Sequence, residues 1–541
     1  TFKQYSNIQP TVLFDFPNLN KLVNKIIGTH RIGNIKSQSY NKQINITGIS
    51  SQFPGSNDPI KFFDFLLQRK SGIQSLNKRF DVNQYKDIYV DQAGLIDNID
   101  IFDHKFFGIN QQELEYIDIR QKLLLTLNYQ ALHNAGFNKE SIVDSNIGIF
   151  VGIDANENFP MENLSSFSAT GRAISIASNR ISYSLGLQGP SMSIDTACSS
   201  ALVAIDVASK FLEKQDIEIA VVSSINILQK PDMFRATCSA KMLSPNCRCA
   251  TFSDQADGYV RAEGCGAIVL ETASDKKYWA HIKSTSIVQD GKTANLTSPN
   301  GPSQESTIQK ALTKAELMPD SITYIEAHGT GTKLGDPIEI QALANVFESK
   351  RDKPLYVGAV KTNIGHLEPA AGIAGIIKTI MILQKRCVPP NLHMETINPL
   401  IAPVISNITF PKDSIVLQSN DTIYGGVSSF GFGGTNGHVI LQSSKDTINE
   451  YDSIQWGIED GFPCRKETEG VWIQEWTPYI CQYLSNHQVG KVPLVPGTCY
   501  IEMLLPCIED QFGSETVGIQ LENIKFKQIL YLPVVYIISN L

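Results

Sequence analysis

A cysteine lies at the point where a predicted strand meets a predicted helix. Residues 189–202 read GPSMSIDTACSSAL, and Met192, Ile194 and Thr196 alternate with polar residues as in a strand leading to Cys198. The following segment, SSALVAIDVASKFLEK, is apolar on nearly every face, which is typical of a buried helix. Free N–H groups at a helix N-terminus stabilise a thiolate over a thiol, and small neighbouring residues leave room for an acyl group. This context predicts a nucleophile rather than an inert core thiol.

Two histidines also follow predicted strands. His328 lies in ITYIEAHGTGTKLGDPIE, where a strand over residues 322–326 ends in a Gly/Thr loop. His366 lies in YVGAVKTNIGHLEPAAGIAGIIKTI, where a strand ends in a loop and Pro369 begins a helix. One cleft at the strand ends could therefore gather Cys198 and both imidazoles. The apolar face expected for the helix consists of Ile373, Ile376, Ile377 and Ile380.

Other patterns that could indicate a site are interpreted differently. A zinc site is disfavoured, and no metal is expected, because Cys247-x-Cys249 lacks a second pair and no His-x3-His occurs. The glycine-rich segment SSFGFGGTNGHVIL at 428–441 is not interpreted as a dinucleotide loop, since such a loop begins a helix and HVIL is typical of a strand. We interpret five further histidines as ordinary surface or core residues: His30, His104, His133, His281 and His393.

The overall composition is that of a globular protein. The chain has 541 residues, 42% of them hydrophobic and 18% charged, so we expect one large domain with smaller pieces. The net charge of −8, without a long block of like charge, disfavours nucleic-acid binding. Ten cysteines without a dense disulfide framework indicate a reducing, cytoplasmic environment. No secretory signal is found, and no membrane span is expected because Lys378 interrupts the apolar stretch AGIAGIIKTIMIL.

Strand-like and helix-like segments alternate from Ile44 to about residue 445, which indicates an α/β fold. Within this region, DTACSSAL resembles the nucleophile motif of the β-ketoacyl synthases. The resemblance covers 44–441 and implies a five-layer α-β-α-β-α fold of the thiolase type and a homodimer, with two halves whose duplication is not visible in the sequence. Further family landmarks follow in order, namely TGISSQFPG, IFDHKFFGIN, TGRAISIASNRISYSLGLQGPSMSIDTACSSAL and LSPNCRCATFSDQADGYVRAEGCGAIVLE.

The chemistry that this resemblance implies is a decarboxylative Claisen condensation by an acyltransferase. Cys198 would take an acyl chain from a carrier thioester. A malonyl-type extender, held on the phosphopantetheine of an acyl carrier protein, would lose CO₂, and the resulting carbanion equivalent would attack the Cys198 thioester. His328 and His366, both neutral, would donate hydrogen bonds to the extender's thioester oxygen as negative charge develops there. No directly bound cofactor is expected.

The resemblance also assigns supporting residues. Lys361, in VKTNIGH, matches a lysine of the family and is expected to organise the site through Glu368. Thr330 and Thr332 match positions that hold the pantetheine arm. GFGGTN resembles the gating loop of the synthases, in which the N–H of Phe432 and that of the nucleophilic cysteine would form an oxyanion hole for the acyl thioester. The Phe432 side chain would also gate the acyl pocket.

The segments on either side of the synthase-like region resemble other parts of polyketide synthases. VLFDFPNLNKLV resembles the closing segment of an acyl carrier domain, so we expect a carrier tail at 1–27 and a linker at 28–43. A second linker at 442–455 precedes 456–541, where YLSNHQVGKVPLVPGTCYIEML resembles the start of a polyketide dehydratase with a hot-dog fold. His487 would be its base. Because the acid of that family lies in a second half-domain, we expect this segment to be truncated and without dehydratase activity in this chain.

The loading of the extender requires a further component. Gly-x-Ser-x-Gly, the nucleophile elbow of an acyltransferase domain, does not occur in the sequence. A separate acyltransferase partner is therefore expected to supply the extender. The chain begins at Thr1 rather than Met, so an incomplete gene model that deletes the domain is the alternative.

Two classes of function remain open. The first is a condensing transferase, and the second is a catalytically silent structural fragment of a megasynthase. The presence of Cys198, His328, His366 and Lys361 favours the first, since a silent relic would be expected to lose at least one of them. A decarboxylating loading domain is disfavoured because the nucleophile is still a cysteine. The acyl chain length, the extender and the product are not indicated.

Overall fold

The structure is a computed structural model that describes most of the synthase-like region. The described residues are 43–155, 164–272, 276–348, 351, 353–418, 422–444 and 448, and five short strands beyond residue 463. The expected carrier tail at 1–27 lies outside the described residues, as does His487. Among the residues described, no helix combines the length and apolar character needed to cross a membrane.

Two halves of the chain build ten strands of one eleven-stranded sheet by the same path, and the short β12 adds the eleventh strand beside β10. In each half the strands lie in the order third, second, fourth, fifth and first. The third, second and fourth strands are parallel, and the fifth runs antiparallel to both the fourth and the first. The first half contains β1 (Ile44–Gln52), β4 (Ile147–Gly152), β5 (Ser191–Ile194), β6 (Ile219–Asn226) and β7 (Gly264–Thr272). The second contains β8 (Ala280–Gln289), β9 (Ile322–Glu326), β10 (Leu355–Gly358), β14 (Tyr424–Phe430) and β15 (Thr435–Ser443).

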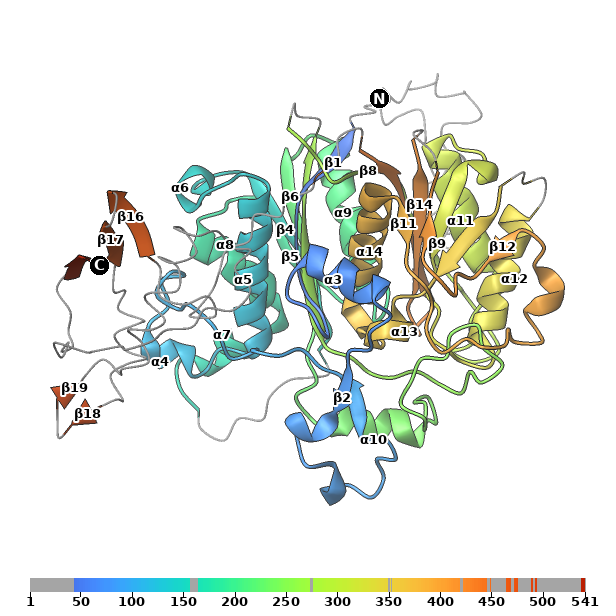
Figure 1. Cartoon of the computed structure of the whole chain (residues 1–541), viewed down its shortest axis with the longest axis horizontal. Helices are drawn as coiled ribbons and strands as arrows, with labels where there is room; N and C mark the ends of the chain where they lie inside the picture. Colours follow the sequence, from blue (N-terminus) through green and yellow to red (C-terminus); the bar gives the residue numbers. More distant parts are fainter. Residues whose placement is uncertain are drawn as a thin grey trace, which may run out of the picture. The chain divides into compact units, whose positions relative to one another are not determined.

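The strands β1 and β8 pair antiparallel and join the two halves. Helices then divide the domain into five layers, which follow one another across Figure 1. The helices α5 and α8 cover the outer face of the first half, α9 and α14 lie between the halves, and α11 and α12 cover the outer face of the second. This arrangement confirms the predicted α-β-α-β-α architecture. The bounds are α5 (Ile119–Asn134), α8 (Ile174–Leu185), α9 (Ser200–Glu213), α11 (Gly301–Ala315), α12 (Gly335–Phe347) and α14 (Ala371–Lys385).

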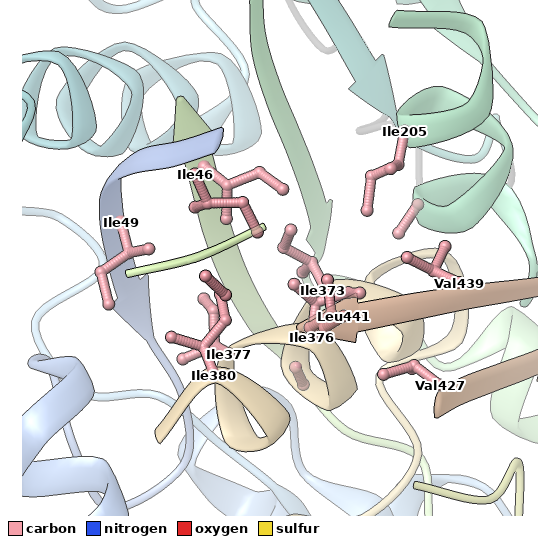
Figure 2. Packing of buried hydrophobic residues seen from close by; sticks show 14 of the residues in the cluster. Ile46, Ile49, Ile205, Ile373, Ile376, Ile377, Ile380, Val427, Val439 and Leu441 are labelled. Carbon is pink, nitrogen blue, oxygen red and sulfur yellow. The ribbon is translucent and has the colours of Figure 1, made fainter. Parts of the chain in front are cut away.

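The middle layer forms the largest apolar core. Figure 2 shows isoleucines of α14 directed toward β1 on one side and toward β14 and β15 on the other. The predicted apolar face of this helix is buried in the core, and burial extends around the whole helix, since every residue from Ala371 to Gln384 is buried. Burial extends to Lys378, which is paired with Glu326 at 2.9 Å. The helix also begins later than predicted, since Pro369 lies in a preceding 3₁₀ turn, η5 (Glu368–Ala370).

Shorter elements surround this framework. The strand β15 continues to Ser443, two residues beyond the expected end of the synthase-like region. Beyond it lie an antiparallel sheet of β16, β17 and β20 and a separate pair of β18 and β19. These strands are β16 (Cys464–Thr468), β17 (Val471–Gln474), β18 (Gln488–Val489), β19 (Val492–Pro493) and β20 (Ile537–Asn540). The short strands of the synthase region are β2 (Ile73–Ser75), β3 (Gln92–Gly94), β11 (Cys387–Val388), β12 (Ile408–Thr409) and β13 (Ile415–Val416). Its remaining α-helices are α3 (Pro59–Leu67), α4 (Gln111–Leu114), α6 (Lys139–Ile142), α7 (Ser168–Arg172), α10 (Asp232–Ser239) and α13 (Lys361–Ile364).

Candidate active site

Cys198 lies between β5 and α9, as the sequence predicts. The preceding residue, Ala197, has a φ of +56°, in the left-handed region that residues with a Cβ rarely adopt. Its N–H donates a hydrogen bond to Asp195 Oδ1 (3.0 Å), and the Cys198 carbonyl accepts one from Ser429 Oγ (2.6 Å). These contacts fix the backbone on both sides of the thiol, which lines a cavity rather than the apolar core.

His366 is held by hydrogen bonds of its backbone and by contacts of its ring nitrogens. Its N–H donates to Val260 O (2.7 Å), and its carbonyl accepts from Ala262 N–H (2.9 Å). The ring Nε2 lies 3.2 Å from Cys198 Sγ, while Nδ1 accepts from the N–H of Glu368 (3.1 Å). Because Nδ1 accepts, a neutral ring carries its proton on Nε2, toward the thiol.

His328 reaches the same place from the end of β9. The carboxylate of Glu339 accepts hydrogen bonds from the N–H groups of His328 (2.7 Å) and Gly329 (2.8 Å) and so fixes the loop. The ring Nδ1 accepts from Phe430 N–H (3.4 Å), which again leaves the proton of a neutral ring on Nε2. The two imidazole rings are 5.4 Å apart and nearly perpendicular. One side-chain N or S atom from each of Cys198, His328 and His366 lies within 4.8 Å of the others.

The electrostatics favour neutral groups in the cavity. Burial, reinforced by the charge of Lys361, holds the pKa of His328 and of His366 well below 6.5. Burial, followed by the charge of Glu368, raises the pKa of Cys198 to about 12. Lys361 and the N–H groups of Phe432 and Cys198 act in the opposite direction on that pKa. Backbone N–H groups thus favour the thiolate, as the sequence analysis expects, but desolvation outweighs them and the resting form is the thiol.

Lys361 and Glu368 contact different partners from those expected. Lys361 Nζ donates to the carbonyl of His328 (2.5 Å) and so supports the loop that carries this histidine. Glu368 accepts two hydrogen bonds from Arg261, at Oε1 (2.6 Å) and Oε2 (2.9 Å). The prediction that Lys361 organises the site through Glu368 was wrong, because Arg261 rather than Lys361 forms the ion pair with this carboxylate.

Cys198, His328 and His366 all line one cavity of about 740 Å³. Thr330 and Thr332 line it, and their hydroxyl oxygens are 3.2 Å apart. Phe432 lines it too, with 55% of the residue exposed. Sequence reasoning missed the part of the lining that comes from α10 and the loops that follow it. No periodic signal marks those residues, and they include Met233, Ala236, Met242 and Tyr259.

Three family models match separate stretches of the chain. The model of the β-ketoacyl synthase N-terminal domain matches residues 41–276, and that of the C-terminal domain matches 279–395. The model of the polyketide synthase dehydratase domain matches 463–535. The chain is thus similar to two consecutive parts of polyketide synthases, in the order that the sequence analysis predicts.

Much longer relatives extend this similarity. The chain is 37% identical over 438 residues to a phenolphthiocerol/phthiocerol polyketide synthase of Mycobacterium bovis, with 75% of this chain matched. It is also 37% identical over 445 residues to the hybrid PKS-NRPS synthetase iccA of Talaromyces variabilis, with 77% matched. The matched part amounts to 23% and 11% of the length of these relatives.

Solved structures agree with the fold. A ketosynthase from module 6 of the bacillaene synthase of Bacillus subtilis 168 has a TM-score of 0.70 at 33% identity, covering 75% of this chain and 73% of that one. The oxazolomycin ketosynthase domain OzmH KS7 of Streptomyces albus JA3453 has a TM-score of 0.71 at 30% identity, covering 75% and 77%. The fold and the Cys–His–His site define a condensing enzyme of the thiolase type. Within that class, the chain belongs to the β-ketoacyl synthase family.

Proposed function

We propose that the chain catalyses the decarboxylative Claisen condensation of an acyl chain on Cys198 with a malonyl-type extender on an acyl carrier protein, in polyketide biosynthesis. The observation that carries the proposal is the paired orientation of the imidazoles. Both Nδ1 atoms accept a backbone hydrogen bond, so His328 and His366 each offer an Nε2–H donor beside the thiol. Two fixed neutral donors suit an oxygen that becomes negative during the reaction.

The first half-reaction is thioester exchange. The Cys198 sulfur attacks the carbonyl carbon of the carrier-bound acyl group, the bond to the pantetheine sulfur breaks, and the proton of Cys198 ends on the released carrier thiol. The thiol must lose its proton for this attack, and burial opposes that loss. The N–H groups of Phe432 and Cys198 and the charge of Lys361 favour the thiolate. These two N–H groups would also stabilise the oxyanion of the tetrahedral intermediate.

The second half-reaction forms the carbon–carbon bond. The extender carboxylate leaves as CO₂, and the electron pair of the broken bond forms an enolate whose oxygen accepts from the two Nε2–H groups. The enolate carbon then attacks the thioester carbonyl, and the Cys198 thiolate leaves and takes a proton from solvent. Low pKa values keep both imidazoles neutral near pH 7, so they donate hydrogen bonds without transferring a proton.

The carrier arm is proposed to reach the cavity past Thr330 and Thr332, whose hydroxyls line it near His328. A separate acyltransferase is proposed to charge the carrier with the extender. A homodimer is proposed as well. Its support is β5, the last strand at one edge of the sheet, which pairs only with β4 among the residues described and directly precedes the Cys198 loop.

The test uses the full chain with an acyl carrier protein charged with an acyl group and another charged with malonate. Mass spectrometry of the carrier arms should show a β-ketoacyl product and release of CO₂. The Cys198→Ala chain, tested beside it, should form none. Absence of product with the unmodified chain, once mass spectrometry has shown acylation of Cys198, would contradict the proposed condensation and favour a silent domain.

A further inference from the structure

The residue that fixes the ring of His366 has an unusual backbone. Glu368 has a φ of +47°, in the left-handed region where a side chain is disfavoured. In this conformation its N–H donates to His366 Nδ1 at 3.1 Å. A strained backbone of this kind persists only where its surroundings hold it. The next question is therefore what holds Glu368.

A buried arginine makes the required contacts. The Arg261 side chain is 0% exposed, and its Nε and Nη2 bind the two carboxylate oxygens of Glu368 at 2.6 and 2.9 Å. The residues on either side of Arg261, Val260 and Ala262, hold the backbone N–H and carbonyl of His366. The segment 260–262 therefore holds the backbone of His366 directly and holds its ring indirectly, through Glu368.

We propose that Arg261 and Glu368 form a positioning pair that sets the tautomer and the orientation of His366 for condensation. Neither residue donates to the substrate in this proposal. The two-pronged ion pair holds the Glu368 backbone in its left-handed conformation, and the N–H of that residue then keeps Nδ1 an acceptor and Nε2 protonated. The inference rests on the proposed function, since the role of His366 as a donor belongs to it.

The same pair also connects the His366 ring to the part of the cavity lining that comes from α10. The Arg261 guanidinium lies over the Phe234 ring at 4.7 Å, and Phe234 belongs to α10 (Asp232–Ser239), which contributes Met233 and Ala236 to the cavity. The Glu368 side chain is 14% exposed and lines that cavity too. Its negative charge opposes formation of the Cys198 thiolate. Neutralising Glu368 should therefore affect thiol reactivity and condensation in opposite directions.

The experiment compares Glu368→Gln and Arg261→Lys in the full chain. Glu368→Gln should lose roughly 10- to 100-fold in condensation rate, the range for residues that orient a functional imidazole. It should react faster with iodoacetamide at Cys198 at a fixed pH, because the carboxylate charge is gone. Arg261→Lys keeps the positive charge but cannot bind both carboxylate oxygens of Glu368. Its condensation rate should therefore also fall by roughly 10- to 100-fold, while the rate of alkylation at Cys198 should change little.

The matched control is Arg79→Lys. Arg79 holds the buried Glu263 with the same two-pronged geometry, at 2.7 and 2.6 Å, and lines no part of the cavity. Arg79→Lys should lose about as much thermal stability as Arg261→Lys, but its condensation rate should be unchanged. The proposal is overturned if Arg79→Lys loses as much condensation activity as Arg261→Lys, or if Glu368→Gln slows alkylation and condensation together.

A second measurement separates this inference from the proposed function. Nitrogen-15 NMR of histidine-labelled chain reports which ring nitrogen of His366 carries the proton, whether or not the chain condenses. Protonation at Nε2 in the unmodified chain, lost or mixed in Arg261→Lys, supports the positioning pair even if no β-ketoacyl product forms. An unchanged Nε2–H signal in Arg261→Lys would overturn the pair even if the chain is an active synthase.

Discussion

The two halves of the domain repeat one strand path but contribute different chemistry at corresponding places. In the first half, the third strand β5 is followed by Cys198 and the middle-layer helix α9. In the second half, the third strand β10 is followed by His366 and the middle-layer helix α14. The thiol and its nearest imidazole, with Sγ and Nε2 3.2 Å apart, thus occupy matching connections. The repeated frame brings two strand ends together, and in the proposed reaction the residues placed there act as nucleophile and as hydrogen-bond donor.

The second strands extend the comparison. His328 lies two residues after the end of β9, and Asp154 lies two residues after the end of β4. Both line the cavity. The Asp154 carboxylate lies 3.8 Å from a nitrogen of the Arg120 guanidinium, whereas a ring nitrogen of His328 lies within 4.8 Å of the Cys198 sulfur. The same position in the frame therefore serves an ion pair in one half and the proposed oxyanion site in the other.

The largest effect is expected from removing the nucleophile. Cys198→Ala should abolish labelling of the chain by an acyl donor. Among the residues described, Cys198 is the one cysteine that lines the cavity. Intact-mass and peptide mapping after acylation measure this. Cys238 and Cys265, both buried in the first half, are the internal comparison. Labelling that persists and maps to either of them would place the nucleophile elsewhere.

The next effect concerns stability and the middle layer of the second half. Lys378 on α14 and Glu326 on β9 are 1% and 2% exposed and 2.9 Å apart. Lys378→Met leaves a buried carboxylate without its cation and should cost about 3–5 kcal/mol in the free energy of unfolding. Denaturant titration measures it.

The double variant Lys378→Met/Glu326→Gln sharpens that prediction. It should recover much of the loss, since neither charge remains buried. Lys78→Met, which breaks the exposed pair with Asp97, should change the unfolding free energy by less than about 1 kcal/mol. Equal losses in the single and double variants would show that the middle layer depends on side-chain volume rather than on charge pairing.

The histidines should separate the two half-reactions. His328→Ala and His366→Ala should each lose on the order of 10²-fold or more in condensation, the scale for one oxyanion donor, while acyl transfer to Cys198 survives better. Asp154→Asn, the corresponding change in the first half, should cost much less. Rapid-quench assays of transfer and of condensation measure the two steps. An equal loss of both steps in both histidine variants would contradict the division of labour.

The pH dependence should report the neutral imidazoles. Lowering the pH protonates Nδ1, which removes the acceptor for the N–H of Glu368 or Phe430 and adds an unpaired charge. Because the pKa values of His328 and His366 lie well below 6.5, this change should occur only far below that pH. The condensation rate should therefore not fall between pH 7.5 and about 6. A half-maximal rate near pH 6.5 would indicate a solvated histidine instead.

Local pattern predicted the strand–cysteine–helix junction and the bounds of β9, because buried strands and helices have distinct periodicities. Relations between distant segments were not predictable in the same way. The ion pair of Arg261 with Glu368 joins residues 107 positions apart, and GYVRAEGCG gives no sign of it. The pKa of Cys198 depends mainly on burial by distant segments, and this effect, which the local pattern at the helix end cannot show, outweighs the backbone N–H groups that favour the thiolate. The repeat of the two halves lies in strand order rather than in residue identity.

The smallest expected effects test whether the carrier arm enters on the His328 side, where the second half differs from the first. The hydroxyl oxygens of Thr330 and Thr332 are 3.2 Å apart, and that of Thr332 also accepts from the N–H of Gly335 (3.2 Å) at the start of α12. Thr330→Val should lose its contact with the Thr332 hydroxyl and its contacts to the arm, but no hydrogen bond to the backbone. One such hydrogen bond contributes about 1 kcal/mol, which corresponds to roughly a fivefold rise in KM for the carrier substrate.

Thr332→Val removes the same kind of contact and also leaves the Gly335 N–H without its acceptor. Its KM should rise at least as much, and its thermal stability should fall, whereas Thr330→Val should keep its stability. The kcat of both should change little, because an arm contact made equally in the ground and transition states affects binding alone. A fall in kcat without a change in KM for Thr330→Val would place this hydroxyl at the reacting oxygen and would contradict entry of the arm past Thr330.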